Sequence, residues 1–307
     1  LRDLTNCIDC HGQNPRGARN IMHVPNGRGN PQVLHNMTNG DLAGGNFYYV
    51  ADGHAPDYAK GHNVAGISNR DFGPGAYMFR YMDVPPGFIG SVKIPGGSGP
   101  VSWNQQLTCS GAQGCHGDRN IADPLESIKG AHHADDSVID GLTVGTSYRF
   151  LYGVKGKEHR NWEYLATSNN HNGYKGDSDY NAMDTISYLC GQCHGQFHPN
   201  SNLGQWQKNF YGWHRHPVDI SFSAVKGGYS GSEYRDYTTY SLKMPVAYMN
   251  PTGAEVTVDT NSIVMCLSCH RAHASPYRSM LRFDYSSMVN SGNIQTGCFT
   301  CHTQKKN

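Results

Sequence analysis

The chain has 307 residues, and its 25 basic and 24 acidic side chains give a formal net charge of +1 at pH 7. This balance excludes the basic surface that a nucleic-acid partner needs, and no run of 18 apolar residues offers a membrane span within this sequence. Only 37% of the residues are hydrophobic and 37 are glycine, so side chains alone would build a thin core.

The first predicted element is a short helix within residues 1–12, which contains the sequence Cys7-Ile8-Asp9-Cys10-His11. Two cysteines three positions apart, with a histidine directly after the second, form the attachment site of a c-type haem. Each thiol adds to one haem vinyl group as a thioether, and residues i and i+3 share a helix face, so both sulfurs meet one porphyrin edge. The histidine then becomes the proximal iron ligand.

Residues 13–105 are rich in glycine and contain no cysteine. Short pieces at 47–50, 76–82 and 89–94 have β-propensity, and clusters of glycine and proline separate them. Long loops inside a compact protein are usually functional. The section contains four histidines, so we expect it to wrap haems and to supply distal ligands. These histidines are His23, His35, His54 and His62.

A stretched version of the haem motif follows, with five residues between Cys109 and Cys115 and with His116 directly after. The alternative is a disulfide that closes a small glycine-rich loop, which an oxidising compartment would permit. All other cysteines belong to regular motifs, so Cys109 and Cys115 can pair only with each other, whether by sharing one haem or by forming a disulfide. The histidine that follows favours haem, and the predicted count is five haems, or four if this pair is a disulfide.

A helix is predicted to begin at Asp123, which is a good N-cap, with proline at the first helical position and Glu126 at capping-box spacing. On this helix His132 continues an apolar stripe, whereas His133 lies about 100° away. In a chain with many haems, this position favours ligation by His132 over His133. The stripe consists of Ile121, Leu125 and Ile128.

Residues 146–154 are predicted to form a strand, and the polar loop 161–181 contains His171. A helical stripe from Met183 to Leu189 then leads into the regular motif Cys190-Gly191-Gln192-Cys193-His194. An aromatic stretch at 205–216 ends near His216. Strands are predicted at 218–225 and 254–259.

A helix at 261–273 is predicted to carry the motif Cys266-Leu267-Ser268-Cys269-His270. His273 lies three residues beyond His270 on the same helical face, which is too close along the chain to reach the opposite side of the same iron. We therefore expect His273 to bind the iron of a neighbouring haem. His198, four residues after His194, repeats this arrangement.

The last regular motif is Cys298-Phe299-Thr300-Cys301-His302. Four regular copies, each followed by histidine, argue against a zinc knuckle or a redox dithiol. Of the 17 histidines, five are predicted proximal ligands: His11, His116, His194, His270 and His302. The distal candidates are His62, His132, His171, His198, His216 and His273. His23, His35 and His54 are candidates for a distal ligand to a haem of an adjacent subunit.

Five segments resemble the multihaem c-type cytochromes of metal-reducing bacteria, including the outer-surface type that polymerises into filaments, the cytochrome nanowires. They are CLSCHRAH at 266–273, GHNV at 61–64, KGAHH at 129–133, CGQCHGQFH at 190–198 and RHP at 215–217. The similarity runs over most of the chain and is densest from 107 to 302. It implies low-spin bis-histidine haems in close contact, little regular secondary structure and an extracellular setting.

We predict one continuous unit over 1–307, with a loop-rich section 1–105 that carries the first haem and a section 106–307 that carries the others. Its fold class is mostly irregular coil with short helices on the haem motifs and a few short strands, around a haem-centred core. The absence of an initial methionine and of an apolar signal region favours a mature exported chain, at the cell surface or outside the cell.

The predicted function is electron conduction along a chain of closely packed haems, in a subunit of a head-to-tail extracellular filament without catalytic residues. Other redox cytochromes or extracellular acceptors would be its partners. One alternative is a discrete periplasmic or cell-surface electron-transfer cytochrome. Another is a multihaem reductase, which needs an open iron position, whereas this chain has histidines to spare.

Overall fold

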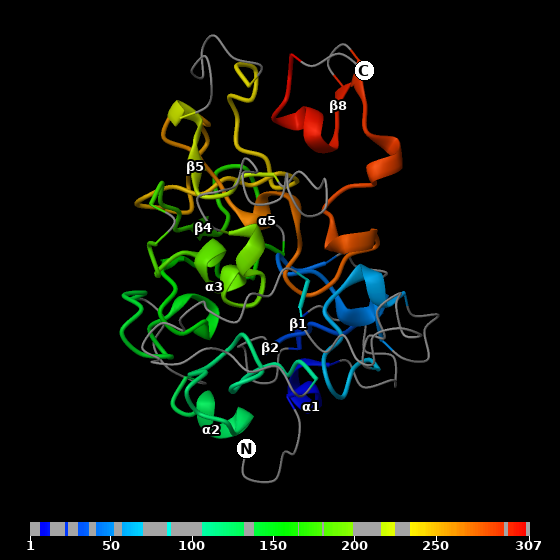
Figure 1. Cartoon of the computed structure of the whole chain (residues 1–307), viewed down its shortest axis with the longest axis vertical. Helices are drawn as coiled ribbons and strands as arrows, with labels where there is room; N and C mark the ends of the chain where they lie inside the picture. The colour runs from blue at the N-terminus through cyan, green and yellow to red at the C-terminus, as the bar shows by residue number, and fades with distance from the viewer. Residues whose placement is uncertain are drawn as a thin grey trace.

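A computed structural model of the chain describes residues 7–12, 22–23, 30–36, 41–51, 57–69, 85–86, 106–131, 138–164, 166–179, 181–198, 216–224, 234–291 and 294–304 (Figure 1). Most of these residues lie outside helices and strands, which confirms the predicted fold class. None of the helices within these ranges is long and apolar enough to cross a membrane.

The described α-helices are α1 (Ile8–His11), α2 (Pro124–Ser127), α3 (Ile186–Cys193) and α5 (Cys266–Cys269). Three of the four, α1, α3 and α5, carry haem motifs, as predicted. The last motif lies on a 3₁₀ helix. The 3₁₀ helices are η2 (Phe47–Tyr49), η3 (Tyr58–Lys60), η4 (Tyr148–Phe150), η5 (Gly195–Phe197), η6 (Phe222–Ala224), η7 (Arg278–Met280), η8 (Tyr285–Ser287) and η9 (Gly297–Thr300).

The described strands form four antiparallel pairs of two residues each, so no layered sheet exists in these ranges. The pairs are β1 (Met22–His23) with β2 (Asn30–Pro31), β3 (Gly156–Lys157) with β4 (Gly173–Tyr174), β5 (Ile220–Ser221) with β6 (Ile263–Val264), and β7 (Asn290–Ser291) with β8 (Ile294–Gln295). Each pair holds two segments of the chain next to each other.

Several strand predictions are wrong. Residues 47–50 form η2, because the side chain of Asn46 accepts from the backbone N–H of Tyr48 and caps a 3₁₀ turn. Residues 146–154 contain η4, since Arg149 has a positive φ that no strand accommodates. The strand predicted at 218–225 is limited to β5, and 254–259 contributes only an isolated bridge. Residues 76–82 and 89–94 lie outside the described residues.

The helix predicted from Asp123 begins as expected but ends after one turn. Both Leu125 and Glu126 donate their backbone N–H to the Asp123 carboxylate at 2.9 Å. The helix ends at Ser127 and Gly130 follows with φ +82°, so the predicted apolar stripe does not form. Leu125 is instead 48% exposed. His132 and His133 lie outside the described residues.

The helix predicted at 261–273 is also shorter, because β6 precedes α5 and His270 has an extended backbone (φ −112°, ψ 156°). The shared helical face of His270 and His273 was therefore a wrong premise. The position of His273 is set by backbone bonds to a distant segment. Its N–H donates to Gly44 O at 2.7 Å, and its carbonyl accepts from the N–H of His62 at 2.9 Å.

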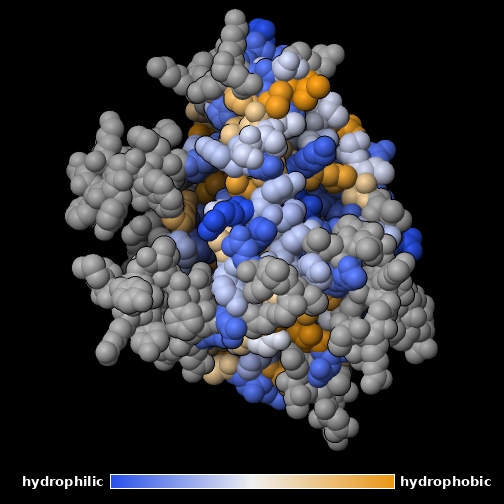
Figure 2. All heavy atoms as spheres, turned by 90° about the vertical axis from the view of Figure 1, so that its right-hand side faces the viewer, coloured by the Kyte–Doolittle hydropathy of each residue, from blue (hydrophilic) through white to orange (hydrophobic). Residues whose placement is uncertain are grey.

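In the part of the chain that the structure describes, the buried apolar side chains form three separate clusters, each in contact with a motif cysteine. The first, which contains Met265 and Leu189, contacts Cys115. The second contacts Cys109 and the third contacts Cys301. Hydrophobic residues accordingly reach the surface at several separate places along the long axis (Figure 2). The core is thus divided among the attachment sites, with α1 and β8 at opposite ends of the molecule (Figure 1).

Candidate haem sites and their histidines

The same type of backbone hydrogen bond occurs in all five cysteine motifs. In every motif the histidine N–H donates to the carbonyl of the first cysteine, at 3.0 Å for His11, 2.9 Å for His194, 3.2 Å for His270 and 2.9 Å for His302. The stretched motif closes in the same way, with the N–H of His116 3.0 Å from Cys109 O. All ten cysteines lie in the described residues, and none of them forms a disulfide. The first cysteine and the histidine are therefore held alike whether two or five residues separate the thiols.

The extra residues of the stretched motif form a tight loop beside this bond. Gly114 lies so close to Ser110 that an added Cβ would be 2.4 Å from the Ser110 Cα, so only glycine fits there. The N–H of Gly114 donates to Gly111 O at 2.9 Å, and Gly111 has φ +85°. Glycine at these two positions lets the chain form the extra loop and still place Cys109 and His116 as in the regular motifs.

Thiols of successive motifs lie next to one another. Cys7 hydrogen-bonds with Cys109, which lowers the pKa of Cys7 to about 7 and raises that of Cys109. A bond to Cys266, together with burial, raises the pKa of Cys190. Helices α3 and α5 pack together there, and the N–H of Cys266 donates to Ser187 Oγ at 3.2 Å. Motifs that follow one another along the chain are therefore neighbours in space.

Four proximal histidines direct Nδ1 at a backbone carbonyl. The distances are 3.0 Å from His11 to Pro31 O, 2.8 Å from His116 to Arg149 O, 2.8 Å from His194 to Pro86 O and 2.7 Å from His270 to Ser279 O. A carbonyl can only accept, so Nδ1 carries the proton. The other ring nitrogen, Nε2, is then the one that can bind a metal.

Three further histidines share this orientation. Nδ1 of His62 lies 2.7 Å from Ala272 O, that of His216 2.8 Å from Pro217 O, and that of His35 3.0 Å from Asn36 O. His35 is 2% exposed and its Nε2 has no hydrogen-bond partner. A buried polar atom of this kind needs an explanation, and a metal would provide one. Burial within its own chain favours ligation by His35 inside its own subunit, and the expectation that it reaches an adjacent subunit stays a prediction.

The remaining described candidates differ. His198 directs Nε2 at the Asp219 carboxylate, 2.6 Å away and buried, so that nitrogen is engaged. His171 has a carbonyl at each nitrogen, Asn172 O at 2.8 Å and Glu255 O at 3.1 Å. In this arrangement Nε2 of His198 and both ring nitrogens of His171 are engaged by other groups. His54 lies outside the described residues, and His23 is described only as backbone in β1.

The structure pairs three proximal histidines with three of the predicted distal candidates. The ring centroids are 6.1 Å apart for His194 and His62, 6.3 Å for His116 and His273, and 6.1 Å for His302 and His216. In each case the two rings come from different parts of the chain. His273 lies beside the proximal histidine of the stretched motif, while its own motif carries His270.

Desolvation favours the neutral form of five of the candidate ligand imidazoles. Desolvation lowers the pKa of His194 to about 4 and that of His273 to about 3. It also lowers the pKa values of His62, His216 and His270. Metals bind neutral imidazole, so no proton needs to be displaced from these rings at neutral pH.

A buried cation lies between the stretched motif and the motif of α3. Arg119 is 5% exposed; it donates to the Gln192 side-chain carbonyl, and its Nη2 lies 3.8 Å from Cys193 Sγ. The charge of Arg119 also acts on Cys115, where it opposes the larger effect of burial on the pKa of that thiol. Its Nε has no hydrogen-bond partner. A buried charge is costly without a counter-charge.

Sequence reasoning missed the groups that hold the proximal rings. Arg149, Ser279, Pro31 and Pro86 act through their peptide carbonyls, which every residue type has. No pattern in the sequence could mark them. Arg119 carried a weak signal, as a charged residue three positions after a motif histidine.

Comparison with known proteins agrees with the haem motifs. A family described as a doubled CXXCH motif matches residues 259–307, which contain the last two motifs. The chain is 26% identical to the C-type cytochrome OmcS of Geobacter sulfurreducens over 227 residues, which cover 62% of this chain and 50% of OmcS. The chain thus spans about half the length of the curated relative it matches.

Two solved structures were also found, an outer membrane cytochrome S filament and OmcS nanowires, both from Geobacter sulfurreducens. Their TM-scores are 0.37 and 0.44, and in both cases the identity is 19%, with 92% of this chain and 75% of the other covered. The paired motifs and the similarity to OmcS identify the chain as resembling OmcS-type multihaem c-type cytochromes.

Proposed function

We propose that the chain is a pentahaem c-type cytochrome that passes electrons along a row of bis-histidine haems. The observation that carries this proposal is the hydrogen bond from the motif histidine to the first cysteine carbonyl, which the stretched motif shares with the four regular ones. Haem would supply one-electron chemistry. The polypeptide contributes two thiols and an imidazole at each site.

Three axial pairs are assigned within the chain: His194 with His62, His116 with His273, and His302 with His216. A metal–imidazole bond is about 2 Å long and the coordinating nitrogen lies about 1 Å from its ring centroid, so two imidazoles on opposite sides of one metal have centroids about 6 Å apart. The three observed separations, 6.1, 6.3 and 6.1 Å, support the assignment.

His273 joins two sites in this assignment. It belongs to the segment of Cys266 and Cys269, but it ligates the iron held at Cys109 and Cys115. One short segment thereby fixes the distance between two neighbouring sites. The remaining distal positions, opposite His11 and His270, stay with the other candidates: His23, His35, His54, His132, His133, His171 and His198.

Arg119 serves as the shared cation of the sites at Cys109/Cys115 and Cys190/Cys193. Thioether sulfurs carry no charge, so attachment gives Arg119 no anionic partner at Cys115 or Cys193. A buried positive charge favours the reduced, more negative state of a nearby redox centre. We assign to Arg119 the role of raising the reduction potentials of these two sites.

Self-association into a head-to-tail filament, with transfer to other redox cytochromes or extracellular acceptors, extends this proposal. It rests on the similarity to OmcS and on the position of the first and last motifs toward opposite ends of the long axis (Figure 1). A heterologous contact between such ends yields an open filament when its rotation does not close. The proposal includes an extracellular location, which the same similarity supports.

The haem count tests the proposal. The intact mass of the denatured native protein should exceed that of the polypeptide by five haem masses. Replacing both Cys109 and Cys115 by serine should reduce the excess to four. An excess of four in the unchanged protein, together with a Cys109–Cys115 disulfide, would contradict it.

A further inference from the structure

Two of the candidate sites use the same backbone turn to hold the proximal histidine. At the stretched motif the turn is 148–151, whose ends are joined by a backbone hydrogen bond of 2.9 Å. Arg149 O accepts from Nδ1 of His116 at 2.8 Å. The next carbonyl, Phe150 O, accepts from the N–H of Gly117 at 2.7 Å. Two successive carbonyls thus bind the histidine ring and the peptide that follows it.

The second copy is the turn 278–281, which holds His270. Ser279 O accepts from Nδ1 of His270 at 2.7 Å, and Met280 O accepts from the N–H of Arg271 at 2.8 Å. The ends of this turn are also joined by a backbone bond, at 3.4 Å. The hydrogen bonds correspond one to one with those of the first copy.

The two copies share an uncommon backbone conformation. Arg149 and Phe150 have φ values of 51° and 59°, and Ser279 and Met280 both have 57°. Side chains other than glycine rarely adopt this left-handed region, and such residues persist only where the surroundings require it. Successive residues with helical backbone angles, right-handed or left-handed, direct their carbonyl groups the same way. The two acceptor carbonyls of each turn therefore face one histidine segment.

Side chains support each turn in a different way. In the first copy Arg149 Nη2 donates to Asn172 Oδ1 at 2.9 Å and to His159 O at 2.8 Å, and Nη1 lies 3.4 Å from Glu158 Oε2. The backbone N–H of Arg149 donates to the same Glu158 carboxylate. A largely buried ion pair therefore anchors the residue whose carbonyl holds His116.

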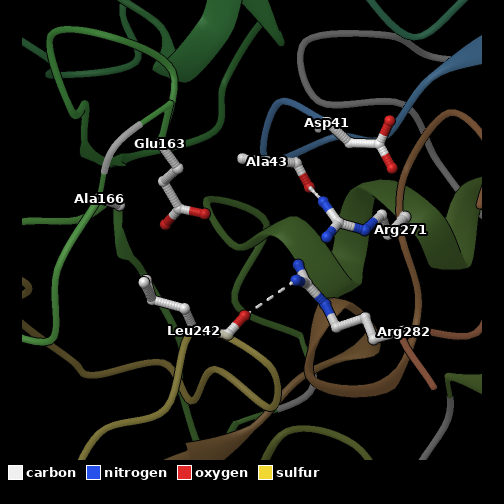
Figure 3. A pocket seen from close by; sticks show the side chains of 7 residues that line it. All are labelled: Asp41, Ala43, Glu163, Ala166, Leu242, Arg271 and Arg282. Carbon is white, nitrogen blue, oxygen red and sulfur yellow. Dashed lines mark hydrogen bonds between the residues drawn. The ribbon is translucent and has the colours of Figure 1, made fainter. Parts of the chain in front are cut away.

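In the second copy Arg282, directly after the turn, binds the carbonyls at the end of α5. Its Nε donates to Leu267 O at 2.6 Å and to His270 O at 3.1 Å, and its N–H donates to Cys269 O at 2.8 Å. Nη1 continues to Leu242 O, in a small cavity that Arg271 also lines (Figure 3). The exposed side chain of Ser279 contributes no support.

We propose that these turns are two copies of one positioning device, which fixes the orientation of the His116 and His270 imidazoles and sets the potentials of their haems. The inference rests on the proposed haem function. A hydrogen bond from Nδ1 to a carbonyl makes the imidazole more basic and fixes its orientation, and a more basic axial ligand stabilises ferric iron. Withdrawal of the carbonyl raises the reduction potential of that haem.

Ser279 provides the test, because its side chain is exposed and its substitution leaves the packing unchanged. Ser279→Val introduces a β-branched residue that resists φ near +57°, while Ser279→Gly accepts it readily and Ser279→Ala controls for loss of the hydroxyl. The readouts are the midpoint potential and the electron paramagnetic resonance g-values of the Cys266/Cys269 haem. That haem is identified by its loss in a Cys266→Ser/Cys269→Ser variant.

We expect Ser279→Val to shift the potential of that haem upward and to change its g-values, while the other haems and the Ser279→Gly and Ser279→Ala spectra stay as in the unchanged protein. Unchanged values in Ser279→Val, with the haem mass intact, would overturn the inference. If Ser279→Val does not mature, the melting temperature of Ser279→Gly decides: an increase supports the left-handed turn, and a decrease overturns it. Absence of covalent haem from the unchanged protein would instead reject the proposed function.

Discussion

The turns at Arg149 and Ser279 have the same backbone and almost unrelated sequences. Tyr148-Arg149-Phe150-Leu151 and Arg278-Ser279-Met280-Leu281 agree only at the final leucine. The first is held by a buried carboxylate and lies 33 residues after its histidine, whereas the second lies nine residues after its histidine and relies on Arg282. The two regions show that one way of holding an axial ligand can be built from different side chains, because its working groups are carbonyls.

The largest effect should come from the residue that joins the two sites. His273→Ala should leave the Cys109/Cys115 haem with one axial histidine, so that its spectrum changes from low spin to high spin and it binds carbon monoxide. The haem of Cys266/Cys269, in the same segment as His273, should stay low spin. A change confined to the Cys266/Cys269 haem would show that the two sites are not joined in this way.

The side-chain support of the first turn can be removed without touching the second. Glu158→Gln deletes the carboxylate that holds Arg149, and breaking a largely buried pair costs about 2–3 kcal/mol of unfolding free energy. Only the His116 site should show altered g-values. The control is Glu126→Gln, which removes a well-exposed pair with Lys129 and should cost under about 0.5 kcal/mol. Equal losses of unfolding free energy in the two variants, measured by chemical denaturation, would argue against Glu158 as the group that anchors Arg149.

Arg119 places a positive charge near the His116 site but not near the His270 site. Arg119→Gln removes a cation near the Cys109/Cys115 and Cys190/Cys193 haems, so the potentials of both should fall. Arg119→Lys keeps the charge and should restore most of the difference. The Cys266/Cys269 potential serves as an internal reference. If spectroelectrochemical titration shows that the potentials of all five haems shift together, the substitution causes a general loss of structure instead.

The smallest effect is expected at the turns themselves. Ser279→Gly relieves a left-handed conformation that costs an ordinary residue about 1 kcal/mol, so stability should rise by about that amount. Arg149→Gly relieves the same conformation but loses the ion pair, and it should destabilise the protein. Opposite signs in thermal unfolding would confirm that the turns differ in their side-chain support and agree in their backbone.

The motifs and the helix cap were predictable from sequence because both depend on local spacing. Cys266 and Cys269 require one helical turn whatever the rest of the chain does, and Asp123 accepts backbone N–H groups of its own helix. The irregular fold class was implied by the resemblance to multihaem cytochromes, whereas the glycine content and the scarcity of apolar side chains predicted only a core filled by haem. These features involve residues close together in the sequence.

The tertiary parts of the sites were not predictable in the same way. The expectation that His273 reaches a neighbouring site agrees with its place beside His116, although the helical premise for it was wrong. His273 is held instead by bonds to residues 44 and 62, more than 200 positions away. His198 looked equivalent in sequence, but Asp219 engages its ring. No single-sequence pattern records which distant carbonyl or carboxylate a histidine meets.

The most direct test of the account is an experimental density map of the haem-loaded protein at the stretched motif. The account predicts an iron bonded to Nε2 of His116 and to His273, with thioether bonds from Cys109 and Cys115 and with Arg149 O accepting from Nδ1 of His116. A disulfide between Cys109 and Cys115, or His273 bound to the iron of the Cys266/Cys269 haem, would contradict it.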